Sequence, residues 1–73
     1  MSFDEFLKKL GLRIKFLRMS KGLNQADLAS LMSSFENNLS NIETGKKNIS
    51  AKTIYKIAQA LEVEPSKLFD FQD

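Results

Sequence analysis

The sequence contains no cysteine and no histidine. Without cysteine the chain forms no disulfides and offers no thiolate ligands, and without histidine it lacks the usual general base and zinc ligand. It also has no GxSxG nucleophile elbow and no glycine-rich phosphate loop. Acids are present, but a small helical chain rarely holds a cleft for a catalytic pair. We therefore expect no enzyme activity, no metal and no cofactor.

Long apolar runs are also missing, since none approaches the roughly 18 residues of a membrane-spanning helix. The opening MSFDEFLKKL carries acids early and lacks the apolar centre of a secretory signal. We therefore expect a cytoplasmic protein without a membrane partner. The 73 residues fit a single domain over 1–73. Its core is marginal, so pairing with a second copy is a common source of stability for such a chain.

Glycine and proline are scarce, with three and one occurrences. Gly22, Gly45 and Pro65 stand where a helix could end or begin. Gly11 falls inside the first helical pattern, where it costs roughly 1 kcal/mol relative to alanine. Neither a strand-like alternation nor a repeat interrupts the helical spacing, so the sequence predicts an all-α fold.

The apolar spacing predicts a compact bundle of five short helices. The first is expected to begin with a capping box of Ser2 and Glu5, and the second at Gln25 with Asn24 as its cap. The third is expected to span Glu36–Glu43, the fourth to be capped by Ser50, and the fifth to begin at Pro65. The residues expected to face inward are Phe6, Leu7, Leu10, Ile14, Leu17, Leu28, Ala29, Leu31, Met32, Leu39, Ile42, Ile54, Ile57, Ala58, Leu61, Leu68 and Phe69.

The net charge of +2 is unevenly distributed along the chain. Six bases and no acid lie between Lys8 and Lys21, whereas Glu62 to Asp73 holds four acids and one lysine. One interpretation is a chance asymmetry of solvated helix faces. The other is a polyanion-binding surface at one end of the fold, with the acidic end held away from it.

The third predicted helix is unusually rich in asparagine. Only Leu39 and Ile42 are clear core positions, and the rest include Glu36, Asn37, Asn38, Ser40 and Asn41. Asparagine is a poor helix former, but its amide bonds adenine at two points in the major groove. Asparagines also occur in irregular helices, so the run favours base contacts without excluding that simpler explanation.

The segment GLNQADLASLMSSFENNLSNIETGKKNIS resembles the helix-turn-helix of the phage repressor and Cro family, also called XRE-like regulators. The resemblance spans about Leu10 to Phe69. Its most specific parts are Arg18 with Gly22-Leu23-Asn24-Gln25, Leu28-Ala29, Ile42-Glu43 with Gly45-Lys46, and the pattern Ile54, Ile57-Ala58, Leu61, Val63. It implies a lambda-repressor-like fold and a sequence-specific transcriptional regulator. Such a regulator binds an inverted-repeat operator in double-stranded DNA as a homodimer, with a recognition helix in the major groove.

The resemblance also implies roles for matching residues. The implied base contacts are Glu36, Asn37, Ser40 and Asn41. The implied phosphate contacts are Asn24, Gln25, Asn38, Lys46, Lys47 and Asn48. Arg18 and Glu43 match a partly buried structural ion pair. At the start of the second helix, free amides and the helix dipole independently favour an anion.

Two residues depart from the family pattern. Ser33 stands where the family has glycine, so either serine adopts a left-handed conformation at some cost or the turn is reshaped. Phe35 replaces a small hydroxyl cap. Either Ser34 caps the helix and starts it one residue early, or Phe35 is an exposed aromatic that touches sugars or a thymine methyl. The register of the recognition helix depends on which of these holds.

Three functions fit this resemblance. A freestanding domain of this size fits a phage Cro-like repressor, and it also fits a controller of a restriction-modification operon. An alternative from another class is an antitoxin-like protein-binding module whose main partner is a toxin. The family implies a dimer contact at the fifth helix and the C-terminal tail, and the candidates for it are Tyr55, Leu68, Phe69 and Phe71. Leu68 and Phe69 could equally complete the monomer core.

Overall fold

The fold was obtained as a computed structural model, which describes residues 1–71. It contains α1 (Phe3–Ser20), α2 (Gln25–Leu31), α3 (Glu36–Glu43), α4 (Ala51–Leu61) and a 3₁₀ helix, η1 (Pro65–Phe69). No strand occurs in these residues, so the all-α prediction is confirmed. The fifth predicted helix begins at Pro65 as expected, but it is not an α-helix. The five-residue segment after Glu64 forms the tighter helix that short pieces of chain commonly adopt.

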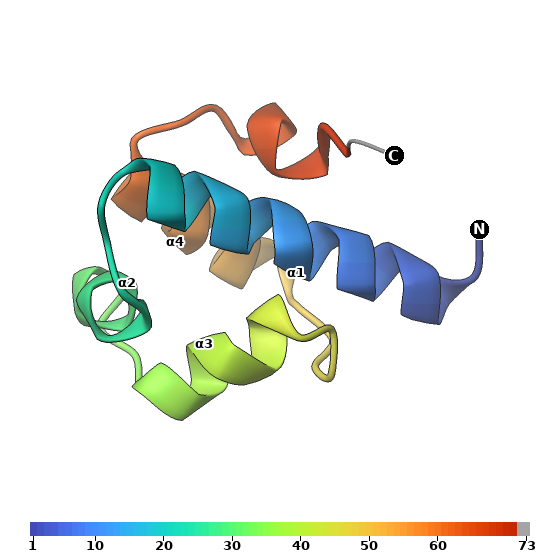
Figure 1. The fold of residues 1–73 in the computed structure, drawn as a ribbon, viewed down its shortest axis with the longest axis horizontal. Coiled ribbons are helices and arrows are strands. Elements are labelled where there is room, and N and C mark those ends of the chain that lie inside the picture. Colours follow the sequence, from blue (N-terminus) through green and yellow to red (C-terminus); the bar gives the residue numbers. More distant parts are fainter. Residues whose placement is uncertain (72–73) are drawn as a thin grey trace.

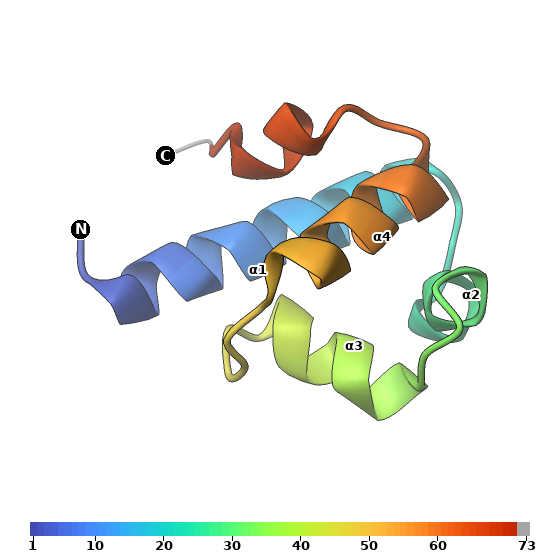
Figure 2. The same cartoon turned by 180° about the vertical axis from the view of Figure 1, so that it is seen from behind.

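The longest helix, α1, runs along the whole molecule (Figure 1). α3 packs on α1 and on α2, while α4 lies behind α1 in this view. The chain then turns back, and η1 lies along α1 and α4 (Figure 2). Within residues 1–71, no helix combines the length and the apolarity needed to cross a bilayer.

The helix ends follow the capping residues that the sequence indicated. Ser2 forms a capping box with Glu5, and Asn24 forms one with Asp27 at the start of α2. The Ser50 hydroxyl accepts a hydrogen bond from the Thr53 amide at the start of α4. These bonds satisfy amides that the first helical turn leaves unpaired. The starts of α1, α2 and α4 are therefore set locally.

The core lies between α1 and the other four elements. Its fully buried large side chains are Leu10, Ile14, Leu28, Leu39, Ile42, Ile57, Leu61 and Leu68. Leu31 was expected there but is 59% exposed, and so this prediction is wrong. α2 ends at Leu31, and Met32, the next residue, takes the inward position. Phe69 also stays partly exposed, at 39%.

α1 passes close to the backbone of α3 at Gly11. A Cβ atom placed on it would lie 2.5 Å from the carbonyl oxygens of both Ile42 and Glu43. No real Cβ approaches backbone oxygens so closely, so only glycine permits this crossing. The tight packing of α1 against α3 offsets the cost of a glycine inside a helix.

The acidic C-terminal segment is not held away from the basic helix. Arg13 donates from Nε to the carbonyl oxygen of Lys67 at 2.8 Å, and its Nη2 lies 3.8 Å from an oxygen of Asp70. The Phe6 ring stacks on Phe69. The predicted separation of the two charged ends is therefore wrong, because η1 folds back onto α1. Asp73 lies outside the described residues.

Candidate nucleic-acid interface

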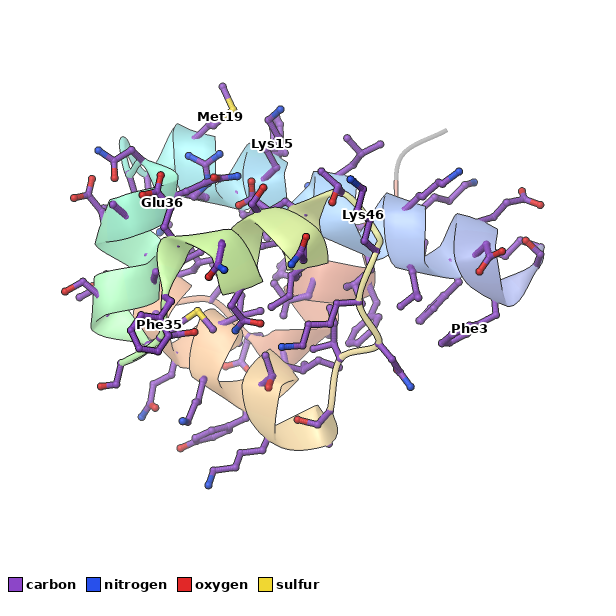
Figure 3. The ribbon with its side chains drawn as sticks, turned by 90° about the horizontal axis from the view of Figure 1, so that it is seen from below. Phe3, Lys15, Met19, Phe35, Glu36 and Lys46 are labelled. Atoms are coloured by element: carbon purple, nitrogen blue, oxygen red, sulfur yellow. The ribbon has the colours of Figure 1, made fainter. Side chains whose placement is uncertain are left out.

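One face of α3 is exposed and polar, whereas the other is packed into the core. Leu39, Ile42 and Glu43 are buried. The outward side chains are Glu36, Asn37 and Asn41, which are exposed, and Ser40, which is half-buried. α3 faces the viewer in Figure 3, with Lys15 and Lys46 at its margins. The helix thus presents amide, hydroxyl and carboxylate groups together on one surface, flanked by bases.

The turn before α3 fixes the register of that helix. Ser33 adopts the left-handed conformation with φ 54°, so the turn keeps its shape without glycine. The helix begins at Glu36 with Phe35 as an N-cap whose side chain makes no capping bond. Ser34 does not cap; its hydroxyl accepts a hydrogen bond from Asn38 Nδ2 at 2.9 Å. The hypothesis of an earlier start is therefore wrong, and Phe35 is exposed at 80%.

A buried ion pair joins α1 to α3. The Arg18 guanidinium donates to the two carboxylate oxygens of Glu43 at 2.7 and 3.1 Å, and to the carbonyl oxygen of Leu23 at 2.7 Å. The two side chains are only 8% and 2% exposed. A buried charge is tolerated when it is paired and fully hydrogen-bonded, as here. This pair holds the end of α1, the start of the helix-turn-helix and α3 in one arrangement.

Gln25, an expected phosphate contact, belongs to the same network. Its Nε2 donates to Glu43 Oε1 at 3.0 Å, and its side chain is half-buried. A primary amide nitrogen carries two hydrogens, so one remains for a further acceptor. Asn24, beside it, uses its side-chain oxygen to cap α2, accepting from the Asp27 amide at 2.7 Å. The carboxylate of Glu43 thus orients the first residue of α2.

The loop after α3 carries Lys46, Lys47 and Asn48, all exposed. Asn38, another expected phosphate contact, is half-buried and accepts a hydrogen bond from the Lys47 ammonium through Oδ1. Its amide nitrogen already donates to Ser34. Both ends of the Asn38 amide are therefore used inside the protein, linking the turn before α3 to the loop after it. The four-residue spacing of Ser34 and Asn38 in the sequence could have predicted the hydrogen bond between these two residues, but not the one to Lys47.

Comparison with known proteins places the chain in a family. Residues 11–72 match the family model described as helix-turn-helix domain, and the chain belongs to this family. The resemblance found in the residues is confirmed.

Three proteins similar to this chain are known as controllers. The control protein C.BamHI of Bacillus amyloliquefaciens is 37% identical over 62 residues, which are 84% of this chain and 76% of that protein. The structure of the restriction-modification controller C.AhdI from Aeromonas hydrophila is similar with a TM-score of 0.85 and 41% identity, covering 86% of this chain and 96% of that one. The structure of the restriction-modification controller C.Esp1396I, as a tetramer in complex with its natural 35 base-pair operator, is similar with a TM-score of 0.81 and 32% identity. The match covers 89% of this chain and 86% of that one.

Proposed function

We propose that this protein is a transcriptional regulator of the restriction-modification controller type, which binds operator DNA as a homodimer and inserts α3 into the major groove. The single observation that carries the proposal is the outer face of α3, where polar side chains stand exposed on a rigidly anchored helix. The controllers named above support the class. None of them is described as an antitoxin, so the antitoxin alternative has no support of this kind.

The outward side chains of α3 suit base edges. Asn37 and Asn41 would each bond an adenine at two points, and Glu36 would accept from a cytosine amino group. The Ser40 hydroxyl would accept or donate a hydrogen bond. α3 has eight residues, so it is about 12 Å long and contacts few base pairs. Useful specificity then requires two copies on half-sites about 34–36 Å apart.

Phosphates would be bound around this helix rather than on it. At the start of α2, the second hydrogen on Gln25 Nε2 and the side-chain amide nitrogen of Asn24 would donate to a phosphate, since the main-chain amide of Asn24 is already bonded to Asp27. Lys46, Lys47 and Asn48 would contact the backbone beyond the other end of α3. Asn38 would act through Lys47, whose ammonium group it holds.

Burial narrows the four candidate residues for the dimer contact. Leu68 is fully buried in the monomer, so it cannot also serve as a contact surface. Phe71 is half-buried and lies edge-on to Phe6, with ring centroids 5.7 Å apart. Tyr55 on α4 is 58% exposed and, with Phe69, is left as the candidate.

The test is a titration of the protein with a preferred duplex at several salt concentrations. About 6–10 phosphate contacts should lower the affinity by roughly 10³–10⁵ between 50 and 200 mM salt. Lys46→Ala should reduce the slope by about one contact, while the matched change Lys56→Ala on α4 should not. Sedimentation of the complex should give two chains per site. A flat salt response would contradict DNA binding, and one chain per fully specific site would contradict the dimer.

A further inference from the structure

The outward side of α1 carries an apolar stripe that the fold does not use. Leu12, Phe16 and Met19 are 62%, 59% and 59% exposed, and they are spaced by four and three residues. This spacing places them on one line of the helix, opposite the buried Leu10 and Leu17. We call these three residues the α1 stripe. Contiguous exposed apolar surface on a small protein commonly marks an interaction site.

The α1 stripe lies beside the surface proposed for DNA. In Figure 3, Met19 and Lys15 project from α1 on the side away from α4, sideways to the exposed face of α3. Leu12 separates two shallow hollows. One, of about 180 Å³, is lined by Lys9, Leu12, Arg13, Phe16 and Phe71. The other, of about 320 Å³, is lined by Lys8, Leu12, Lys15, Gln25, Glu43 and Thr44. The stripe is thus a ridge with room on both sides for the side chains of a neighbouring helix.

The charges on α1 that border the α1 stripe are all basic, and the two acids beside it, Asp70 and Glu43, are each paired with an arginine of α1. Lys8 and Lys15 lie along one edge and are exposed. Lys9 and Arg13 lie along the other edge, where the Arg13 guanidinium also stacks on Phe16 at 5.6 Å from the ring centroid. No acid occurs between Phe6 and Ala26. A ligand for this surface must therefore combine apolar side chains with negative charges at their margins.

We propose that the α1 stripe docks an amphipathic helix of a partner protein, whose apolar residues are flanked by aspartate and glutamate. Anchors at this spacing are typical of helices that pack along an apolar groove or against a second helix. The partner's apolar residues would enter the hollows beside Leu12, and its acids would meet Lys8 and Lys15. This inference does not depend on the proposed DNA binding.

Two other occupants fit the surface less well. A symmetric contact between two copies would bring Lys8 and Lys15 close to the same residues of the second chain, where like charges repel. DNA would meet the lysines, but its sugar-phosphate backbone would leave Leu12, Phe16 and Met19 without an apolar partner. Charge and apolarity together favour an acidic helix.

The experiment titrates the full chain with two labelled helical peptides that share a leucine stripe. Glutamates flank the stripe in one peptide and lysines flank it in the other, and fluorescence anisotropy measures binding. We expect saturable binding of the glutamate peptide and binding at least about tenfold weaker for the lysine peptide. Equal affinities, or no saturable binding of the glutamate peptide, would overturn the proposal.

Variants then locate the peptide. Phe16→Ser should weaken binding of the glutamate peptide by about tenfold or more, whereas Leu31→Ser, equally exposed at 59% but on α2, should leave it unchanged. Lys15→Glu should reduce the preference for the glutamate peptide, and Lys56→Glu on α4 should not. Melting curves will show that each variant is folded.

The same variants distinguish the other occupants. If the free chain self-associates and Phe16→Ser abolishes that association, the surface binds a second copy and the proposal is wrong. If Phe16→Ser instead lowers DNA affinity as strongly as Lys46→Ala, the stripe belongs to the DNA surface and the proposal is equally wrong.

Discussion

The two sides of α3 differ in how firmly their side chains are held. On the inner side, Glu43 accepts hydrogen bonds from Arg18 and Gln25, and Leu39 and Ile42 are buried. On the outer side, Asn37 and Asn41 make no hydrogen bond within residues 1–71 through their side chains. The inner side therefore determines where α3 lies. The side chains on the outer side remain available for contacts with a ligand. Substitutions on the inner side should affect folding first, and those on the outer side should affect DNA preference alone.

The largest expected effect comes from the inner side. Glu43→Ala strands the buried Arg18 charge and should cost about 3–5 kcal/mol of unfolding free energy. This is a large share of the stability of a small domain, so the melting temperature should fall sharply. Glu36→Ala, on the outer side of the same helix, is the control and should change stability by no more than about 0.5 kcal/mol. A Glu43→Ala protein that melts like wild type but fails to bind DNA would contradict the assignment.

A second change on the inner side tests the crossing of α1 and α3. Gly11→Ala should raise helix propensity, yet its Cβ would collide with the carbonyl oxygens of Ile42 and Glu43. We expect a net loss of about 1–3 kcal/mol, measured by denaturant unfolding. Leu12→Ala, the next residue but exposed, is the matched control. If Gly11→Ala stabilises the protein, the close crossing is not the reason for this glycine.

On the outer side, Glu36 is the residue to change. If its carboxylate accepts from a cytosine, Glu36→Gln should reduce discrimination at one base pair per half-site by about 1–3 kcal/mol, with stability nearly unchanged. A first-turn acid also suits the helix dipole without any base contact. In that case the variant should bind every sequence somewhat more tightly, because repulsion from phosphates is relieved. A base-by-base affinity scan separates the two outcomes, and the uniform gain would remove Glu36 from the base contacts.

The smallest effect is expected in the turn between α2 and α3. Ser33 holds φ at 54°, a conformation that costs a non-glycine residue about 1–2 kcal/mol. Ser33→Gly removes this strain but loses about 0.5–1 kcal/mol through the freer unfolded chain. We expect a gain of at most about 1 kcal/mol and an unchanged preferred DNA sequence. A clear loss of stability, with Ser30→Gly in α2 as reference, would show that serine makes a contact that the turn requires.

The sequence predicted those parts of the fold that local chemistry determines. The bounds of α3 followed from the core spacing of Leu39 and Ile42 and from Gly45, and the N-caps followed from Ser2, Asn24 and Ser50. Family resemblance named Arg18 and Glu43, which the structure places in contact.

The remaining features depend on contacts between distant segments. The position of the acidic end beside Arg13 results from the return of η1 along α1, which no local pattern encodes. The same holds for Gly11 against α3. It also holds for Asn38, whose amide links Ser34 to Lys47, while the phosphate contact that the resemblance implied for Asn38 stays a prediction. Leu31 and the 3₁₀ form of η1 show that apolar spacing loses its predictive value near the ends of short helices.

The central claim is that the outer face of α3 determines which DNA sequence the protein prefers. It is tested most directly by selecting bound sequences from random duplex DNA with the wild-type protein and with Asn41→Ala. The wild type should select two related half-sites in inverted orientation. The variant should lose preference at the same adenine in both half-sites, by about 1–3 kcal/mol, with an unchanged salt dependence. A variant that selects the same sequence as wild type at every position, or a wild type that selects none, would contradict the account.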